Sequence, residues 1–200
     1  IDGNFDDWLS IPKYTDSPDN AVPKDVDIVA YAADLSGGKL SFYCQVRGTM
    51  MGSTTHSGAN VTEIYVDSDA SEDTGYHIKS IGAEYRIAIR GWDGTINNAD
   101  AWKYTGGSDH GNWNAWSPQS VYLRQASGGS QLEIQVNAND FEVVGDYRIL
   151  FYAGDSNWFK DFSEVSIGKS PGALLVTQSS LTNLISKASG QKLMKLDLKA

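Results

Sequence analysis

Cysteine is almost absent from this sequence: Cys44 stands alone among 200 residues, so neither a disulfide nor a cysteine metal cage can form within the chain. Its place in the alternating run LSFYCQV predicts a buried apolar side chain and not a reactive thiol. No apolar run approaches the length of a membrane span, which predicts no direct membrane insertion. Positive charge is also scarce, and the net charge of −9 excludes nucleic acid and anionic membrane surfaces as partners. Cations and neutral molecules remain as possible ligands.

The motifs of the common enzyme classes are missing as well. The sequence has no nucleotide-binding glycine loop, no HExxH zinc helix and no GxSxG elbow. Its three histidines, at positions 56, 77 and 110, are scattered and fit surface or turn positions. The sequence therefore predicts a protein that is not an enzyme, although a catalytic group assembled in space would leave no local motif.

The composition favours a protein that works outside the cell. Glycine, serine, asparagine, threonine and aspartate are plentiful, and Asn60-Val-Thr62 forms a glycosylation sequon. The chain begins at Ile1 without a methionine or a signal peptide, which indicates a processed or trimmed product. We expect an extracellular or cell-surface location.

Alternation of apolar and polar residues predicts a series of short strands. In KLSFYCQVR every second residue from Leu40 to Val46 is apolar, as a half-buried antiparallel strand requires. Separators such as Ser36-Gly-Gly38 and Trp92-Asp-Gly94 are typical of tight turns. The expected fold is all-β, an antiparallel β-sandwich. The predicted strands span residues 26–33, 39–47, 61–67, 84–91, 120–125, 131–137 and 147–154.

One segment near the C-terminus has helical spacing instead. Its apolar residues from Leu181 to Ala188 follow the i, i+3, i+4, i+7 pattern, and Gly190 is a natural stop. We therefore expect a sandwich domain over residues 1–177. Residues 178–200 should form a short C-terminal helix and a strand that dock on the sandwich or lead into a further domain.

The stretch VDSDASEDTGY, from Val66 to Tyr76, is the strongest candidate for a cation site. Carboxylates this close repel one another unless water, a basic side chain or a metal ion offsets their charge. Glu72 and Ile78 stand where an EF-hand requires glycine and glutamate, so the loop is not an EF-hand. Two interpretations are open: a solvated hairpin turn, or a calcium site. The candidate calcium ligands are Asp67, Asp69, Ser71, Asp73 and Glu84.

Tryptophan is concentrated in one part of the chain, because four of the six tryptophans lie between residues 92 and 116. An indole offers a flat apolar face that stacks on the C–H face of a sugar ring, while polar neighbours bind the hydroxyls. The alternative is that these large side chains cover the core. The candidate ligand-binding residues are Trp92, Trp102, Trp113, Trp116, Trp158 and Arg86.

Several motifs, in their order along residues 1 to about 160, resemble the family-9 carbohydrate-binding modules and their DOMON-like relatives in prokaryotic secreted or cell-surface proteins. The opening IDGNFDDW resembles the IDGxxDexW start of that family. The segment TEIYVD resembles its "vEiFiD" strand, with Glu63 and Asp67 in the acidic positions. TGY followed by AEYR, then QLEIQVNANDF and DYRILFYAGDS, resemble later segments and place Asp155 at the family's aspartate.

This resemblance implies a jelly-roll-like sandwich with structural calcium and, in the sugar-binding members, a saccharide clamped between two tryptophans. The chain departs from that pattern at residues 55–60, which hold no tryptophan where one clamp residue is found. Trp158 is a loose match to the other clamp residue.

Two functions therefore remain open. The first is a non-catalytic, calcium-stabilised module that binds a saccharide or another cell-surface polymer. The second is a structural or adhesive domain of a surface-layer-like protein, without a small ligand and joined to other domains. A third interpretation, a haem-binding DOMON domain, requires axial methionine and histidine ligands, for which Met50, Met51 and His110 are the candidates.

Overall fold

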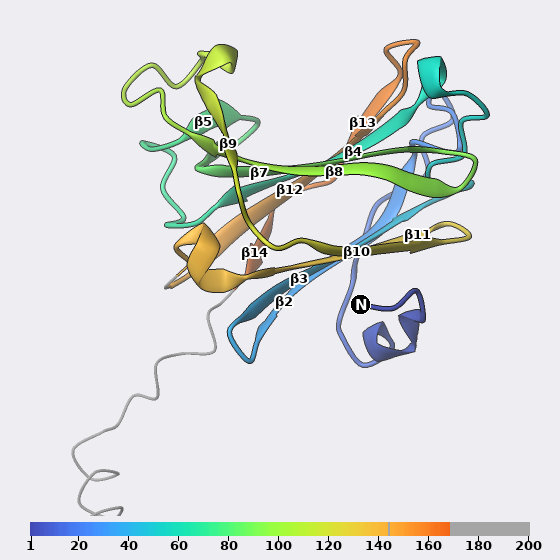
Figure 1. Cartoon of the computed structure of the whole chain (residues 1–200), viewed down its shortest axis with the longest axis horizontal. Helices are drawn as coiled ribbons and strands as arrows, with labels where there is room; N and C mark the ends of the chain where they lie inside the picture. The colour runs from blue at the N-terminus through green and yellow to red at the C-terminus, as the bar shows by residue number, and fades with distance from the viewer. Residues whose placement is uncertain (144, 169–200) are drawn as a thin grey trace, which may run out of the picture. The chain divides into compact units, whose positions relative to one another are not determined.

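The structure, a computed structural model, describes residues 1–143 and 145–168. These residues form an antiparallel β-sandwich of two main sheets, one layered on the other (Figure 1). The predicted all-β, jelly-roll-like sandwich is confirmed. The predicted C-terminal helix and strand, and the boundary at residue 177, lie outside the described residues. Within the described ranges, no helix is long and apolar enough to cross a bilayer.

The two sheets differ in size. The first contains, in spatial order, β1 (Tyr14–Thr15), β2 (Ile28–Ser36), β3 (Lys39–Val46), β11 (Gln131–Asn137) and β10 (Arg124–Gly128). The second contains β13 (Lys160–Phe162), β12 (Tyr147–Gly154), β4 (Asn60–Asp67), β7 (Tyr85–Trp92), β8 (Thr95–Tyr104) and β9 (Trp116–Gln119), and β14 (Ser166–Gly168) also pairs with β12. A separate hairpin consists of β5 (Tyr76–Ile78) and β6 (Ile81–Ala83). The short 3-10 helices are η1 (Phe5–Trp8), η2 (His56–Gly58), η3 (Trp113–Ala115) and η4 (Ala138–Phe141).

The main core lies between the two sheets, because every second side chain of the central strands points inward. Phe42 and Cys44 of β3 belong to the same buried cluster as Ile64 of β4 and Ile87 of β7, which face each other in the ladder of the second sheet. Cys44 is 1% exposed, so the prediction of a buried apolar residue is confirmed. Burial raises the pKa of its thiol, which keeps it neutral and unreactive.

Most predicted strands are present, but the one at residues 120–125 is wrong over most of its length. β10 begins only at Arg124, and the preceding residues carry the chain from β9 in the second sheet to β10 in the first. Val121 and Leu123 in this crossing pack against the main core, which produces strand-like alternation without strand pairing. Conversely, β8 was not predicted because polar residues fill half of its sequence, TINNADAWKY, and the adjacent asparagines interrupt the alternation.

The backbone of the N-terminal IDG segment is hydrogen-bonded to a buried carboxylate on the outer side of the first sheet. Glu133 of β11 is fully buried, and its Oε1 accepts hydrogen bonds from the backbone N–H groups of Asp2 and Gly3, both at 2.8 Å. Its Oε2 accepts a bond from Trp8 Nε1 at 3.1 Å. Gly3 has a φ of +83°, a conformation that other residues rarely adopt. Trp8 then packs on Tyr43, with ring centroids 5.4 Å apart.

We expect Glu133→Ala to lower the free energy of unfolding by roughly 3 kcal/mol, because three donors would lose their buried acceptor. Glu133→Gln should cost less, since an amide oxygen can still accept the two backbone bonds. Urea denaturation measures both changes. Gln135→Ala, on the same face of β11, is the matched control and should cost less than about 1 kcal/mol. Equal effects of Glu133→Ala and Gln135→Ala would contradict the structural role of Glu133.

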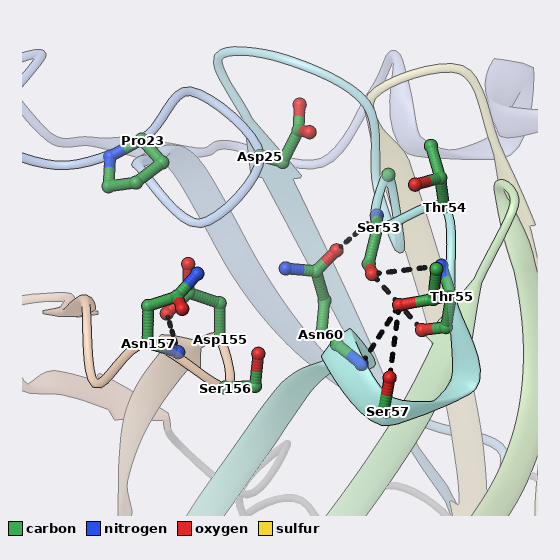
Figure 2. A pocket seen from close by; sticks show the side chains of 12 residues that line it. Pro23, Asp25, Ser53, Thr54, Thr55, Ser57, Asn60, Asp155, Ser156 and Asn157 are labelled. Carbon is green, nitrogen blue, oxygen red and sulfur yellow. Dashed lines mark hydrogen bonds between the residues drawn. The ribbon is translucent and has the colours of Figure 1, made fainter.

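The glycosylation sequon is inaccessible in the folded chain. Asn60, the first residue of β4, is 5% exposed. Its Oδ1 accepts a hydrogen bond from the backbone N–H of Ser53 at 2.7 Å (Figure 2). The sequon therefore gives no support for glycosylation of the folded surface.

Candidate functional site

The outer face of the second sheet, which points away from the main core, carries an aromatic and charged cluster. In the ladder, Tyr65 of β4 lies opposite Arg86 of β7, and Arg86 lies opposite Trp102 of β8. The hairpin of β5 and β6 contributes to a second apolar cluster on this face, in which Tyr65, Ile81 and Trp116 are buried. The same sheet therefore packs on both sides over part of its area.

Arg86 lies at the centre of this cluster and is only 5% exposed. Its guanidinium carbon lies 4.5 Å from the ring centroid of Trp113 and 5.3 Å from those of Trp102 and Trp116. Its Nη1 lies 3.3 Å from Glu63 Oε1. One buried positive charge is thus stabilised by one carboxylate and three indole rings. Arg86 supports Trp113 from within the protein.

A hollow of about 350 Å³ opens beside this cluster, and we name it the Trp113–Trp158 hollow after the indoles on its wall. Trp113 is 48% exposed and Trp158 is 91% exposed, and they are the two exposed tryptophans in the described part of the chain. Polar residues also line the hollow. The other wall residues that matter for ligand binding are Glu63, Arg90, Tyr152 and Lys160.

Trp158 is held in an unusual conformation by a short turn between β12 and β13. Its φ is +68°, in the left-handed region that bulky residues rarely adopt. Asp155 fixes the turn, because its Oδ1 accepts hydrogen bonds from the N–H groups of Asn157 at 2.9 Å and Phe159 at 3.1 Å. Burial does not compensate this strain, since the ring is exposed. Uncompensated strain of this kind is concentrated at functional sites.

The other candidate tryptophans lie elsewhere. Trp116 is 7% exposed, and Trp102 is partly buried against the same second apolar cluster. Trp92 is half-buried and makes an edge contact with His56, with ring centroids 4.8 Å apart. These three residues and Arg86 are not part of the wall of the hollow, and direct contact between any of them and a ligand stays a prediction.

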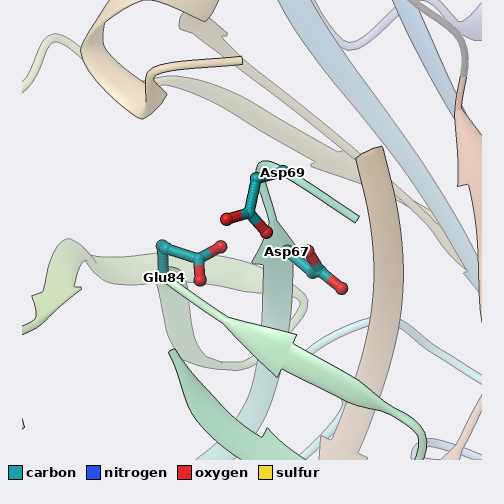
Figure 3. A group of neighbouring side chains, drawn as sticks. All are labelled: Asp67, Asp69 and Glu84. Carbon is teal, nitrogen blue, oxygen red and sulfur yellow. The ribbon is translucent and has the colours of Figure 1, made fainter. Parts of the chain in front are cut away.

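An acidic cluster lies at the far end of β4 from the hollow. Asp67, Asp69 and Glu84 each place one carboxylate oxygen within 4.8 Å of the others (Figure 3). Asp67 is the last residue of β4 and is fully buried, Asp69 follows it in the loop, and Glu84 directly precedes β7. The sequence placed all three among the candidate calcium ligands, and the fold brings them together.

Two of the carboxylate oxygens in this cluster lack hydrogen bonds. The backbone N–H of Ser71 donates to Asp67 Oδ1 at 3.1 Å and to Asp69 Oδ1 at 3.0 Å. Asp67 Oδ2 and Glu84 Oε1 are buried and have no hydrogen-bond partner within residues 1–143 and 145–168. Arg148 Nη1 lies 3.9 Å from Asp67 Oδ2, within ion-pair range but beyond hydrogen-bonding distance. Unpaired buried carboxylate oxygens are costly, and a cation among them would offset that cost.

The pKa values agree with a site in which Arg148 only partly offsets the negative charge. Burial, and then the negative charge of Glu84, raise the pKa of Asp67 to about 7. Burial also raises the pKa of Glu84. An oxygen-only set of donors suits calcium. Asp73 lines a hollow of about 460 Å³ together with Asp69 and Glu84, whereas Ser71 Oγ accepts a hydrogen bond from Asp73 N. The roles of Ser71 and Asp73 as ligands stay predictions.

The candidate haem ligands do not meet. Met51 is buried in the main core, and its side chain adjoins Gly91 near the end of β7. His110 Nδ1 lies 2.8 Å from the carbonyl oxygen of Gly75, which adjoins Ala83 just before β7 begins. The methionines and the histidine therefore lie at opposite ends of β7, where they cannot flank one iron atom.

Two wall residues of the hollow could have been found from the sequence but were missed. Arg90 and Tyr152 occupy outward-facing positions of predicted strands, and the alternation of those strands places them on the exposed face. Nothing in the alternation indicates that these two residues lie beside Trp158. Lys160 follows the turn after β12, and no pattern in the sequence indicates that it lines the hollow.

Comparisons with known protein families and with curated proteins find no match to this chain. Among solved structures, the chain is similar to a family-9 carbohydrate-binding module from Caldicellulosiruptor kristjanssonii in complex with cellotriose. The two are 13% identical, with a TM-score of 0.44, over 86% of this chain and 80% of that chain. A likeness of this degree assigns no role to any residue, so the function of this chain has to be argued from its own side chains.

Proposed function

We propose that this chain is a non-catalytic, calcium-stabilised carbohydrate-binding module that works outside the cell, and that the Trp113–Trp158 hollow is its saccharide site. The observation that carries the proposal is the pair of exposed indoles on one hollow. A sugar ring stacks its C–H face on an indole, and its hydroxyls hydrogen-bond to polar groups at the edge. Glu63, Arg90 and Lys160 supply those groups here.

The indole of Trp113 and the backbone of Trp158 are held in place before any ligand arrives. Trp113 packs against the buried guanidinium of Arg86, and the turn fixed by Asp155 presents Trp158. A platform that is partly preformed loses less conformational entropy on binding, which favours affinity for a flexible saccharide.

Calcium would serve the same site indirectly. Asp67, Asp69 and Glu84 would hold the ion, and its positive charge would offset three neighbouring carboxylates. Asp67 ends β4 and Glu84 precedes β7, the strands that carry Glu63 and Arg86. The ion would therefore stabilise the strands on which the hollow is built.

One observation favours the alternative, a structural or adhesive domain without a small ligand. Trp158 and its neighbour Phe159 are 91% and 46% exposed, and adjacent exposed apolar side chains are also typical of surfaces that bind another protein. The two functions differ in whether a free saccharide binds.

We expect Trp158→Asn to weaken saccharide binding by at least about tenfold, because the exposed ring carries the stacking contact. The melting temperature should stay level or rise slightly, since asparagine tolerates the left-handed conformation better than tryptophan. A glycan array that includes cellotriose, run with calcium and again with a chelator, finds the ligand, and isothermal titration then measures the affinities.

Tyr122→Asn is the matched control, because Tyr122 is 70% exposed but does not belong to the wall of the hollow. It should keep the wild-type affinity. If no glycan binds in calcium, the carbohydrate function is wrong and the structural or adhesive function is the better explanation.

A further inference from the structure

Arg148 is a positively charged side chain at the edge of the acidic cluster. It belongs to β12 and lies opposite Asp67 in the ladder of the second sheet. Its Nη1 donates hydrogen bonds to Glu72 Oε1 at 3.1 Å and to the carbonyl oxygen of Ser80 at 3.4 Å. Glu72 lies in the loop between β4 and β5, which we call the acidic loop, and Ser80 lies between β5 and β6. Arg148 therefore connects the acidic loop and the hairpin to the second sheet.

This arginine offsets the negative charge of the cluster only in part. Its Nη1 lies 3.9 Å from Asp67 Oδ2, which is too far for a hydrogen bond. That oxygen is buried and has no hydrogen-bond partner among the described residues. Arg148 is also the one basic residue that forms an ion pair with the acidic cluster within residues 1–143 and 145–168. The same guanidinium is hydrogen-bonded to Glu72, so a single positive charge is shared among several carboxylates.

A calcium ion and Arg148 would compete for the same carboxylate. An ion held by Asp67, Asp69 and Glu84 uses the carboxylate that the guanidinium approaches. Two positive charges that share one carboxylate repel each other, and a divalent ion experiences twice the repulsion of a monovalent one. A buried carboxylate with neither partner is costly. Arg148 therefore stabilises the ion-free chain and opposes binding of the ion.

We propose that Arg148 is a built-in counter-ion that sets the affinity of the acidic cluster for calcium. It keeps the ion-free chain folded, and it shifts uptake of the ion to a higher calcium concentration. Calcium-binding modules outside cells have Kd values of about 10⁻⁴–10⁻³ M, and we expect this chain to bind in that range. The inference rests on the proposed function only for the identity of the ion.

The test is isothermal titration of the whole chain with calcium at pH 7 and about 0.15 M salt, together with melting temperatures in calcium and in chelator. Arg148→Met removes the charge and keeps much of the aliphatic side chain. It should tighten calcium binding by at least about tenfold. Its melting temperature should fall below that of the wild type in chelator and approach that of the wild type in saturating calcium. A purely structural role would lower both melting temperatures and would not tighten binding.

Two further variants separate charge from shape and from net charge. Arg148→Lys keeps the positive charge, so its affinity for calcium should stay within about threefold of the wild type. Arg124→Met is the matched control, because it makes the same change in net charge. Arg124 contacts the carbonyl oxygen of Ile1 and forms no ion pair among the described residues, so this variant should bind calcium like the wild type.

The outcomes separate this inference from the proposed function. An affinity of Arg148→Met that equals or falls below that of the wild type would overturn the inference and leave the proposed calcium site standing. Calcium binding by Arg148→Met but not by the wild type would support the inference and rule out calcium as a stabiliser of the native chain. Binding by neither would overturn both, and the saccharide site would still be tested by the glycan array in chelator.

Folding of the variant is itself informative. Arg148→Met that stays unfolded in saturating calcium would overturn the inference, because the ion would then fail to replace the arginine. Equal tightening in Arg148→Lys and Arg148→Met would also overturn it, because the lysine variant keeps the charge.

Discussion

Chelation of calcium is expected to lower the melting temperature, and the loss should grow as the pH rises from about 4 to about 7. In the absence of the ion, the folded chain holds a proton on Asp67 that the unfolded chain has released, because the pKa is raised from 3.8 to about 7. Raising the pH through this window removes that proton and leaves a buried charge whose cationic neighbour, Arg148 Nη1, lies 3.9 Å away and makes no hydrogen bond to it. Folded-state stability therefore falls with pH when no ion is bound.

Calcium should reverse this dependence, because it binds the ionised carboxylates. One pKa unit corresponds to about 1.4 kcal/mol, so the difference between calcium and chelator should reach a few kcal/mol near pH 7. Binding to the native state alone adds about 2.7 kcal/mol when the ion is at 100 times its Kd. Differential scanning calorimetry across the pH range, with calcium and with chelator, measures the effect.

Asp67→Asn should abolish both the response to calcium and the fall of stability with pH, since it removes the buried carboxylate and nearly keeps its shape. Asp93→Asn is the matched control: Asp93 is an exposed turn residue with a φ of +54°, which asparagine tolerates equally well. A melting temperature at pH 7 that is the same in calcium and in chelator would rule out the proposed ion site.

The sequence predicted the fold where local pattern and packing agree. β11 and β12 begin and end at the residues expected from alternation, because each has one face in the main core and the other outside it. Alternation gave the wrong result where side chains are buried without strand pairing, and where a paired strand does not alternate regularly. Residues 120–123 alternate while crossing between the sheets, and the adjacent asparagines of β8 interrupt its alternation.

The candidate sites, too, could be predicted only where local sequence determines which residues come together. The acidic cluster could be predicted, because Asp67 and Asp69 are close in sequence and Glu84 begins the neighbouring strand segment. The exposed tryptophans could not be told from the buried ones. Trp113 and Trp116 are three residues apart, yet their exposures of 48% and 7% depend on how the loop after β8 packs on Tyr76 and Arg86. No local pattern records that contact.

Arg86→Met is expected to cost roughly 3–5 kcal/mol in the free energy of unfolding. It would leave Glu63 buried without its cationic partner, which lies 3.3 Å away, and would remove the positive charge packed among the three indoles. Urea denaturation measures the change. The matched control is Arg90→Met on the same face of β7, where the ion pair with Asp100 is solvent-exposed, so the loss there should stay below about 1 kcal/mol.

A second substitution separates buried charge from packing. In Glu63→Gln with Arg86→Met neither charge remains, so the double variant should recover most of the stability that Arg86→Met loses, which gives a coupling energy of at least about 2 kcal/mol. Saccharide affinity should not recover with it, because Trp113 would still lack the guanidinium on which it packs at 4.5 Å. If Arg86→Met and Arg90→Met cost the same, the aromatic and charged cluster does not stabilise the sheet. If the double variant also binds saccharide like the wild type, Arg86 does not position Trp113 for the ligand.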